Sequence, residues 1–170
     1  PVLTQNVNTV SYVNLSPKDW VFSVSKLSGN ATIQASESVN ARYTTSSGTV
    51  GPAANIVKYT SKSYDSHNAY NPSTGLYTCP VSGKYSVKAQ IYNSGSWTAN
   101  QLMYAAIYKN GTEQVESEIR FQGSINTPLT VTVSCSAGET ISIYCYNNGT
   151  SVAHGGNAIV EFVAIEKVGN

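Results

Sequence analysis

The sequence predicts an all-β fold, in the form of a β-sandwich or barrel, and three observations lead to that prediction. Short segments alternate apolar and polar residues with a period of two, as Tyr85, Val87 and Ala89 do against the polar residues between them. Tight-turn signals such as Asn110-Gly111 separate these segments. No segment shows a convincing 3.6-residue period, so we expect almost no helix.

Length and composition limit the classes of protein to consider. A chain of 170 residues is long enough to bury one sizeable core. Its net charge of +1 argues against a nucleic-acid partner, which requires a basic surface. No apolar run approaches the roughly 20 residues of a membrane-spanning helix, so we expect no membrane insertion. The chain starts at Pro1 with no visible signal peptide, and we expect it to be a fragment or processed product of a longer protein.

Residues 1–18 have no clear period, and we expect them to form an N-terminal tether or edge segment ahead of a domain at 19–170. The long stretch 26–55 contains candidate short strands, and 56–64 has β-like character. Counting these, we expect about ten strands in all. The eight main strands are expected at 20–25, 76–79, 84–92, 101–109, 113–121, 129–135, 140–146 and 158–167, and the shorter candidates at 31–34, 41–44 and 56–64.

The stretch from Tyr70 to Tyr85 joins a turn, a short strand, a second tight turn and the start of a longer strand. It resembles the signature of the globular head of complement C1q and its relatives in the tumour-necrosis-factor-like superfamily. The resemblance extends over about residues 19–168. The matching positions are Tyr70, Asn71, Thr74, Gly75, Tyr77, Thr78, Cys79, Pro80, Gly83 and Tyr85.

The resemblance implies a jelly-roll β-sandwich that assembles as a homotrimer about a threefold axis. The Gly-X-Y repeat that often precedes such heads does not occur in residues 1–18, so a collagen stalk directly upstream is not expected.

The chain has three cysteines, Cys79, Cys135 and Cys145, which cannot all pair within one subunit. Cys135 and Cys145 flank a predicted hairpin around the turn at 137–139, but they do not face each other in its expected register. We expect three buried free thiols that pack as small apolar groups.

The sequence offers little for catalysis, and we expect no enzyme, no cofactor and no metal site. Asp65 and His67 lie beside Ser66, but closeness in sequence does not make a catalytic triad. Glu116 and Glu118 share one strand face, which favours a solvated surface over an acid–base pair. The loops are poor in the carboxylates that calcium requires.

A binding surface is expected where the long polar loops gather. If the eight main strands run alternately up and down, their even number puts both chain ends at one end of the domain, together with the tight turns, and the long loops lie at the other end. Trp97 and Tyr146 are the candidate stacking aromatics. The candidate hydrogen-bonding residues are Asn100, Asn147, Asn148 and His154.

These observations favour a non-enzymatic trimeric binding head at the tip of a longer fibrous protein, located extracellularly or on a virion surface. Such a head would recognise a cell-surface glycan or protein on behalf of a phage, a virus or a bacterial fibre. One alternative is a secreted animal C1q-domain recognition protein, either lectin-like or cytokine-like. Another is a passive trimerisation or capsid-decoration module. The sequence leaves all three open.

Overall fold

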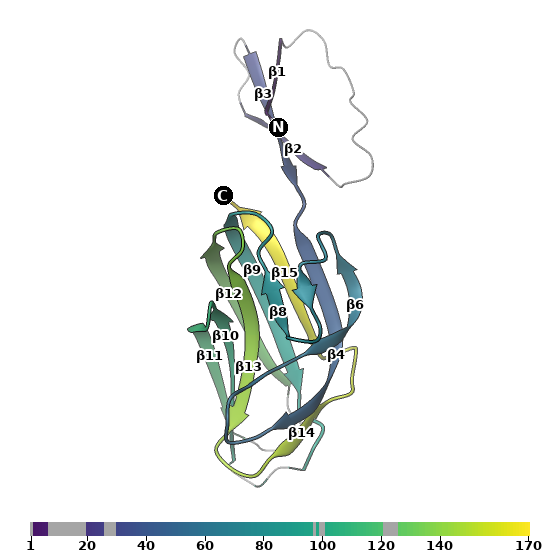
Figure 1. The fold of residues 1–170 in the computed structure, drawn as a ribbon, viewed down its shortest axis with the longest axis vertical. Helices are drawn as coiled ribbons and strands as arrows, with labels where there is room; N and C mark the ends of the chain where they lie inside the picture. Colours follow the sequence, from purple (N-terminus) through teal and green to yellow (C-terminus); the bar gives the residue numbers. More distant parts are fainter. Residues whose placement is uncertain (1, 7–19, 26–29, 97, 99–100, 121–125) are drawn as a thin grey trace. The chain divides into compact units, whose positions relative to one another are not determined.

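The computed structural model describes residues 2–6, 20–25, 30–96, 98, 101–120 and 126–170 (Figure 1). They belong to two compact units, Pro1–Ser38 and Val39–Asn170. The first unit holds three antiparallel strands in the order β1-β3-β2: β1 (Val2–Asn6), β2 (Trp20–Ser25) and β3 (Asn30–Glu37). The domain boundary expected after residue 18 stays a prediction.

The described residues of the second unit form twelve strands, arranged in two antiparallel sheets, and contain no helix. One sheet runs β12-β9-β15-β4, with β6 and β14 paired to different parts of β4; the other runs β11-β10-β13-β8-β7, with β5 also paired to β13. The strands are β4 (Asn40–Val50), β5 (Asn55–Ile56), β6 (Tyr59–Asp65), β7 (Tyr70–Asn71), β8 (Leu76–Thr78), β9 (Gly83–Tyr92), β10 (Leu102–Lys109), β11 (Thr112–Arg120), β12 (Asn126–Cys135), β13 (Thr140–Asn147), β14 (Val152–Gly155) and β15 (Phe162–Gly169).

The core lies between these two sheets, because each central strand turns alternate residues inward. Along β9, the side chains of Tyr85, Val87, Ala89 and Ile91 are almost completely buried, and the residues between them are more exposed. This alternation confirms the predicted all-β sandwich. The part of the chain that the structure describes contains no helix long and apolar enough to cross a membrane.

The alternation is interrupted in β4 at Thr45, which has a φ of 56°. Before this residue β4 pairs with β15, and after it β4 pairs with β14. Thr44 and Ser46, on either side of Thr45, are both buried. The irregular residue therefore brings the hydroxyl of Ser46 into the interior of the unit, where it needs polar partners.

The predicted hairpin between Cys135 and Cys145 is wrong. Strand β12 pairs with β9 in one sheet, and β13 pairs with β10 and β8 in the other. Residues 136–139 therefore cross from one sheet to the other. The turn chemistry in this stretch indicated where the chain reverses, but a reversal can join two sheets as well as two neighbouring strands.

The last predicted strand, 158–167, begins later than expected. Residues 158–160 form a turn in which the Ile159 amide donates to Asn157 Oδ1 at 3.1 Å, and the strand itself starts at Phe162. Strand β14 was not expected at all, since four residues containing His154 and Gly155 carry little β signal.

The three cysteines are free and buried, as predicted. Cys79 and Cys135 interact through their thiols, and burial raises the pKa of both. Burial also raises the pKa of Cys145 to about 12, with the Glu161 charge adding to the effect. All three groups are therefore protonated and unreactive at neutral pH.

We expect all three thiols to be inert to a thiol reagent in the native protein and to react fully in denaturant. Counting modified cysteines by mass spectrometry before and after denaturation measures this. Freshly prepared protein without reductant serves as the starting sample. Rapid modification of the native chain, or fewer than three thiols in denaturant, would contradict the expectation.

Candidate binding surface

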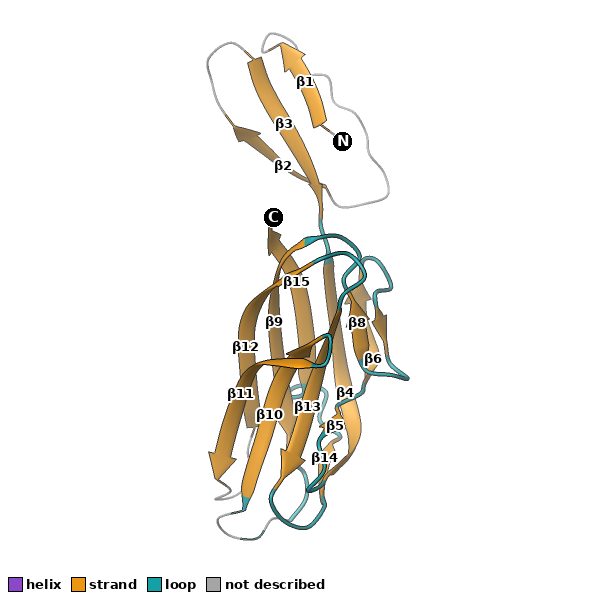
Figure 2. Cartoon of the chain, turned by 60° about the vertical axis from the view of Figure 1, so that its left-hand side comes forward, coloured by secondary structure: helices purple, strands orange, loops and turns teal. Residues whose placement is uncertain are grey.

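Three loop segments meet at one end of the Val39–Asn170 unit, which we call the loop end, at the lower edge of Figure 2. The segments comprise residues 51–54, 94–96 and 147–151. The Asn147 amide donates to the carbonyl of Gly51 at 2.8 Å, and the Asn148 amide donates to that of Leu102 at 3.2 Å. Nearby, the Gly95 amide donates to the carbonyl of Ala153 at 3.0 Å. Backbone hydrogen bonds thus tie segments that lie far apart in the sequence into one surface.

Tight turns occupy the opposite end of the same unit. The Gly138 amide donates to the carbonyl of Cys79 at 2.8 Å, and the Asn110 amide donates to that of Thr140 at 2.9 Å. The first and last parts of the unit also meet here, because the Lys167 amide donates to the carbonyl of Val39 at 2.8 Å. The loop end therefore lies away from this junction of the unit's first and last strands.

Asn147 holds the loop end together. Its side chain is almost fully buried, and its amide nitrogen donates to the carbonyls of Val50 at 2.5 Å and Thr150 at 3.1 Å. Its Oδ1 accepts a hydrogen bond from the Gly149 amide at 2.8 Å. The polar groups of the Asn147 side chain thus form hydrogen bonds within the protein. This geometry favours Asn147 as a residue that holds the loops in place over one that contacts a ligand directly.

Two other predicted residues lie closer to solvent. Asn148 is exposed, and its Oδ1 accepts a hydrogen bond from the Leu102 amide at 2.9 Å. Tyr146 is half-buried, and its ring stacks on that of Tyr104 with 4.4 Å between centroids and 4° between planes. Burial raises the pKa of Tyr146, and the charge of Glu116 adds to this, so its hydroxyl is a hydrogen-bond donor at neutral pH.

His154 belongs to a buried polar cluster with Ser46 and Glu161. Ser46 Oγ donates to Glu161 Oε1 at 2.5 Å and lies 3.1 Å from His154 Nδ1. The Ser46 amide donates to Glu161 Oε2 at 3.2 Å, and His154 Nδ1 lies 3.4 Å from Glu161 Oε1. The same imidazole nitrogen faces both neighbours, whereas a triad uses one nitrogen for the nucleophile and the other for the carboxylate.

This cluster is better suited to stabilising the fold than to catalysis or ligand contact. Ser46 and Glu161 are fully buried, and His154 is buried beside them. Sequence reasoning missed both Ser46 and Glu161, because they lie more than 100 residues apart and belong to no motif. The remaining two predicted residues, Trp97 and Asn100, lie outside the described residues.

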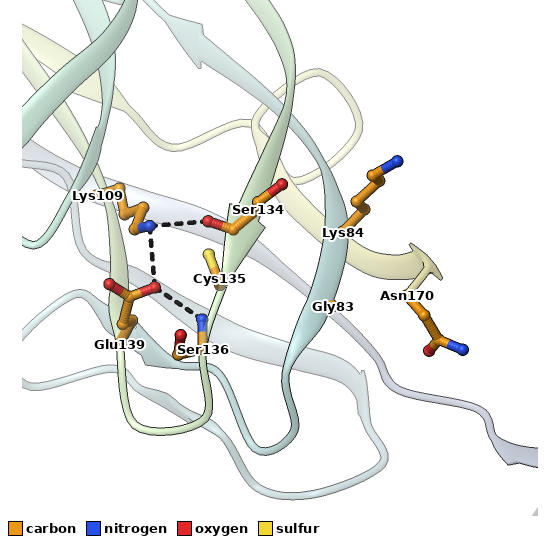
Figure 3. Close-up of a pocket in the computed structure, with 8 residues that line it drawn as sticks. All are labelled: Gly83, Lys84, Lys109, Ser134, Cys135, Ser136, Glu139 and Asn170. Carbon is orange, nitrogen blue, oxygen red and sulfur yellow. Dashed lines mark hydrogen bonds and ion pairs between the residues drawn. The ribbon is translucent and has the colours of Figure 1, made fainter.

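A pocket of about 340 Å³ lies at the turn end, between the segments around Gly83 and Cys135 (Figure 3). Lys109 Nζ donates to the carbonyl of Ser134 at 2.8 Å and pairs with Glu139 Oε2 at 2.9 Å. The Ser136 amide donates to the same carboxylate oxygen at 2.7 Å. The charges of Lys109 and Glu139 are thus matched to each other, and the two side chains brace the crossing at 136–139.

Comparison with known proteins gives the family. The family of C1q domains matches residues 38–133, which is more than half of the chain. This chain belongs to the C1q domain family. Domains of the C1q and tumour-necrosis-factor type are in general trimeric binding modules, typically extracellular and non-enzymatic.

Solved structures of this type share the fold. The structure of Eiger TNF from S. frugiperda is similar with a TM-score of 0.60 and 11% identity, over 78% of this chain and 94% of that one. The globular domain of zebrafish complement 1qA protein is similar with a TM-score of 0.53 and 11% identity, over 75% of this chain and 99% of that one. The C1q-domain chain described here therefore has the jelly-roll sandwich that its signature implied, and the resemblance is confirmed.

Proposed function

We propose that this C1q domain is the non-enzymatic binding head of a longer fibrous protein, and that it acts as a homotrimer. Residues before the domain serve as its tether. The loop end of each subunit recognises a cell-surface glycan or protein, in the setting of a phage, viral or bacterial fibre. The observation that carries this proposal is the gathering of the segments at 51–54, 94–96 and 147–151 at one end of the second unit.

The polar character of the loop end supports recognition of a ligand with many hydroxyl or amide groups. Asn148, Ser151 and Thr150 are exposed there, and Tyr146 lies at the adjoining end of β13. Aromatic rings that border amide and hydroxyl groups suit the stacking of a sugar ring or the anchoring of a protein side chain. A trimer would present this surface three times, so weak single sites would add up by avidity.

We expect Trp97→Ala and Tyr146→Ala each to lower binding to a glycan array, or to a panel of bacterial and animal cells, by about tenfold or more. Each change removes one aromatic contact, and avidity multiplies the loss over three sites. Labelled protein at equal concentration measures the binding. Lys84→Ala, an exposed side chain at the turn end, is the matched control and should bind like the parent.

Light scattering on every variant separates loss of assembly from loss of contact. The proposal expects a trimer for the parent protein and for all three variants at micromolar concentration. A monomeric parent protein would contradict the trimeric head. If the Trp97→Ala variant and the Tyr146→Ala variant each bind like the parent, the assignment of the loop end as the binding surface is contradicted.

A further inference from the structure

A strip of four tyrosines covers the outer face of β10 and β13. Tyr104 lies directly opposite Tyr146 in the register of these strands. The rings of Tyr108 and Tyr144 approach to 4.4 Å between centroids with 41° between planes. Ala106 and Ser142, on the same face, are almost fully covered. The strip thus consists of two tyrosine pairs on one sheet face, and all four side chains are half-buried on the side away from the core.

Three glutamates of the neighbouring edge strand β11 border this strip. Glu113 pairs in register with Tyr108, and Glu118 pairs with Tyr104, so both share the tyrosine face. Glu116, opposite Ala106, lies between them on that face. All three are exposed, and Tyr108 donates its hydroxyl hydrogen to Glu113 Oε2 at 3.1 Å.

The carboxylates are crowded and poorly neutralised. Burial raises the pKa of Glu116, and the like charges of Glu113 and Glu118 raise it further, while a hydrogen bond from Tyr146 partly opposes them. The cation that β11 itself supplies is Arg120, whose Nη2 lies 3.9 Å from Glu118 Oε1 with both side chains largely exposed. Such an exposed, long pair neutralises little of this charge. The face would gain from a partner that brings positive charge to it.

We propose that the outer face of β10, β11 and β13 binds an extended, arginine-rich segment of a partner protein. Guanidinium groups stack on tyrosine faces and form forked hydrogen bonds with carboxylates, and this face offers both groups side by side. Side chains two residues apart on a strand repeat at about 6.6 Å on one face. An extended partner with alternate arginines has the same repeat as Glu116 and Glu118 on β11.

This inference goes beyond the proposed function, because it concerns a sheet face and a basic protein partner. The contact between Glu113 and Tyr108 lies toward the turn that holds Asn110, whereas the loop end begins at the opposite end of β10. Tyr146 is common to both surfaces, so the two proposals are separated by residues that only one of them uses: Trp97 for the loop end, and Tyr108 and Glu116 for the sheet face. Trp97→Ala should weaken the loop-end site and leave binding to the sheet face unchanged.

The probe is an eight-residue peptide that alternates arginine and serine, measured by calorimetry against the whole chain at low ionic strength. Peptides that replace arginine with lysine or with glutamate are the comparison probes. We expect the arginine peptide to bind most tightly and the glutamate peptide not to bind. Glu116→Gln combined with Glu118→Gln should weaken binding about tenfold, and Tyr108→Leu or Tyr144→Leu about fivefold.

The matched controls are Glu166→Gln and Tyr64→Leu, which alter an exposed carboxylate and an exposed tyrosine on the other sheet. Both should leave the affinity within about twofold of the parent. Equal binding of the lysine and arginine peptides, with no loss in the tyrosine variants, would overturn the proposal. So would a change in oligomeric state in the glutamate variants, which would make a second copy of this chain the occupant.

Discussion

Replacing Glu161 with alanine is expected to destabilise the Val39–Asn170 unit by about 3 kcal/mol. The Glu161 carboxylate is fully buried and accepts hydrogen bonds from both the amide and the hydroxyl of Ser46. It also lies within reach of the His154 imidazole. Removing it leaves buried donors without their acceptor, and each such group costs about 1–3 kcal/mol.

Denaturant unfolding of parent and variant at the same protein concentration measures this difference in the free energy of unfolding. Glu166→Ala is the matched control, since Glu166 is an exposed carboxylate on β15 and its loss should change stability by less than about 0.5 kcal/mol. Should Glu161→Ala prove as stable as the Glu166 control, the buried cluster would not be a stabilising element of the fold.

Replacing Gly155 with alanine is expected to cost about 3 kcal/mol, or to prevent folding. Gly155 has a φ of +94°, a region that disfavours any residue with a Cβ atom. A Cβ at this position would also clash with the backbone carbonyl of Ser46, which cannot move aside as a flexible side chain could. The strain and the clash add, and both fall where β14 ends beside β4.

Gly156 provides a control in the next position. Its φ of +87° is as unusual, but a Cβ there would meet no atom within 4 Å. Gly156→Ala should therefore cost only the backbone strain, about 1 kcal/mol. Thermal or denaturant unfolding of the two variants compares them directly. If Gly155→Ala and Gly156→Ala lose equal stability, the close approach to Ser46 does not constrain this turn.

Much of the fold could be predicted, because strand alternation and turn chemistry are local properties. The strand expected at 84–92 is observed as Gly83–Tyr92, and the Asn110-Gly111 turn joins β10 to β11. Which strands pair is not local. Residues 136–139 have the chemistry of a hairpin turn, yet β13 continues in the other sheet, where it pairs with β10 and β8 and turns its apolar residues toward the core between the sheets.

The candidate site was harder to predict for the same reason. The sequence singled out His154 and Asn147 as polar loop residues, but it could not indicate that Ser46 and Val50 would meet them in space. Part of the tyrosine strip can be read from the sequence, since Tyr104, Ala106 and Tyr108 are two residues apart and so share one face of a strand. Its stack between Tyr104 and Tyr146 depends on the register between β10 and β13, which a single sequence does not specify.

The pairing of β4 with β15 also has a consequence for how the chain is made. Ala41 on β4 lies opposite Ile165 on β15. The first strand of the second unit therefore cannot complete its pairing until the last strand has been synthesised. Until then β9 also lacks one of its two neighbours. Until β15 is available, β4 and β9 thus each keep one edge open to wrong partners. This unit can complete its two sheets only after β15 has been made, and loss of a few residues from β15 would harm it far more than an equal loss from a loop.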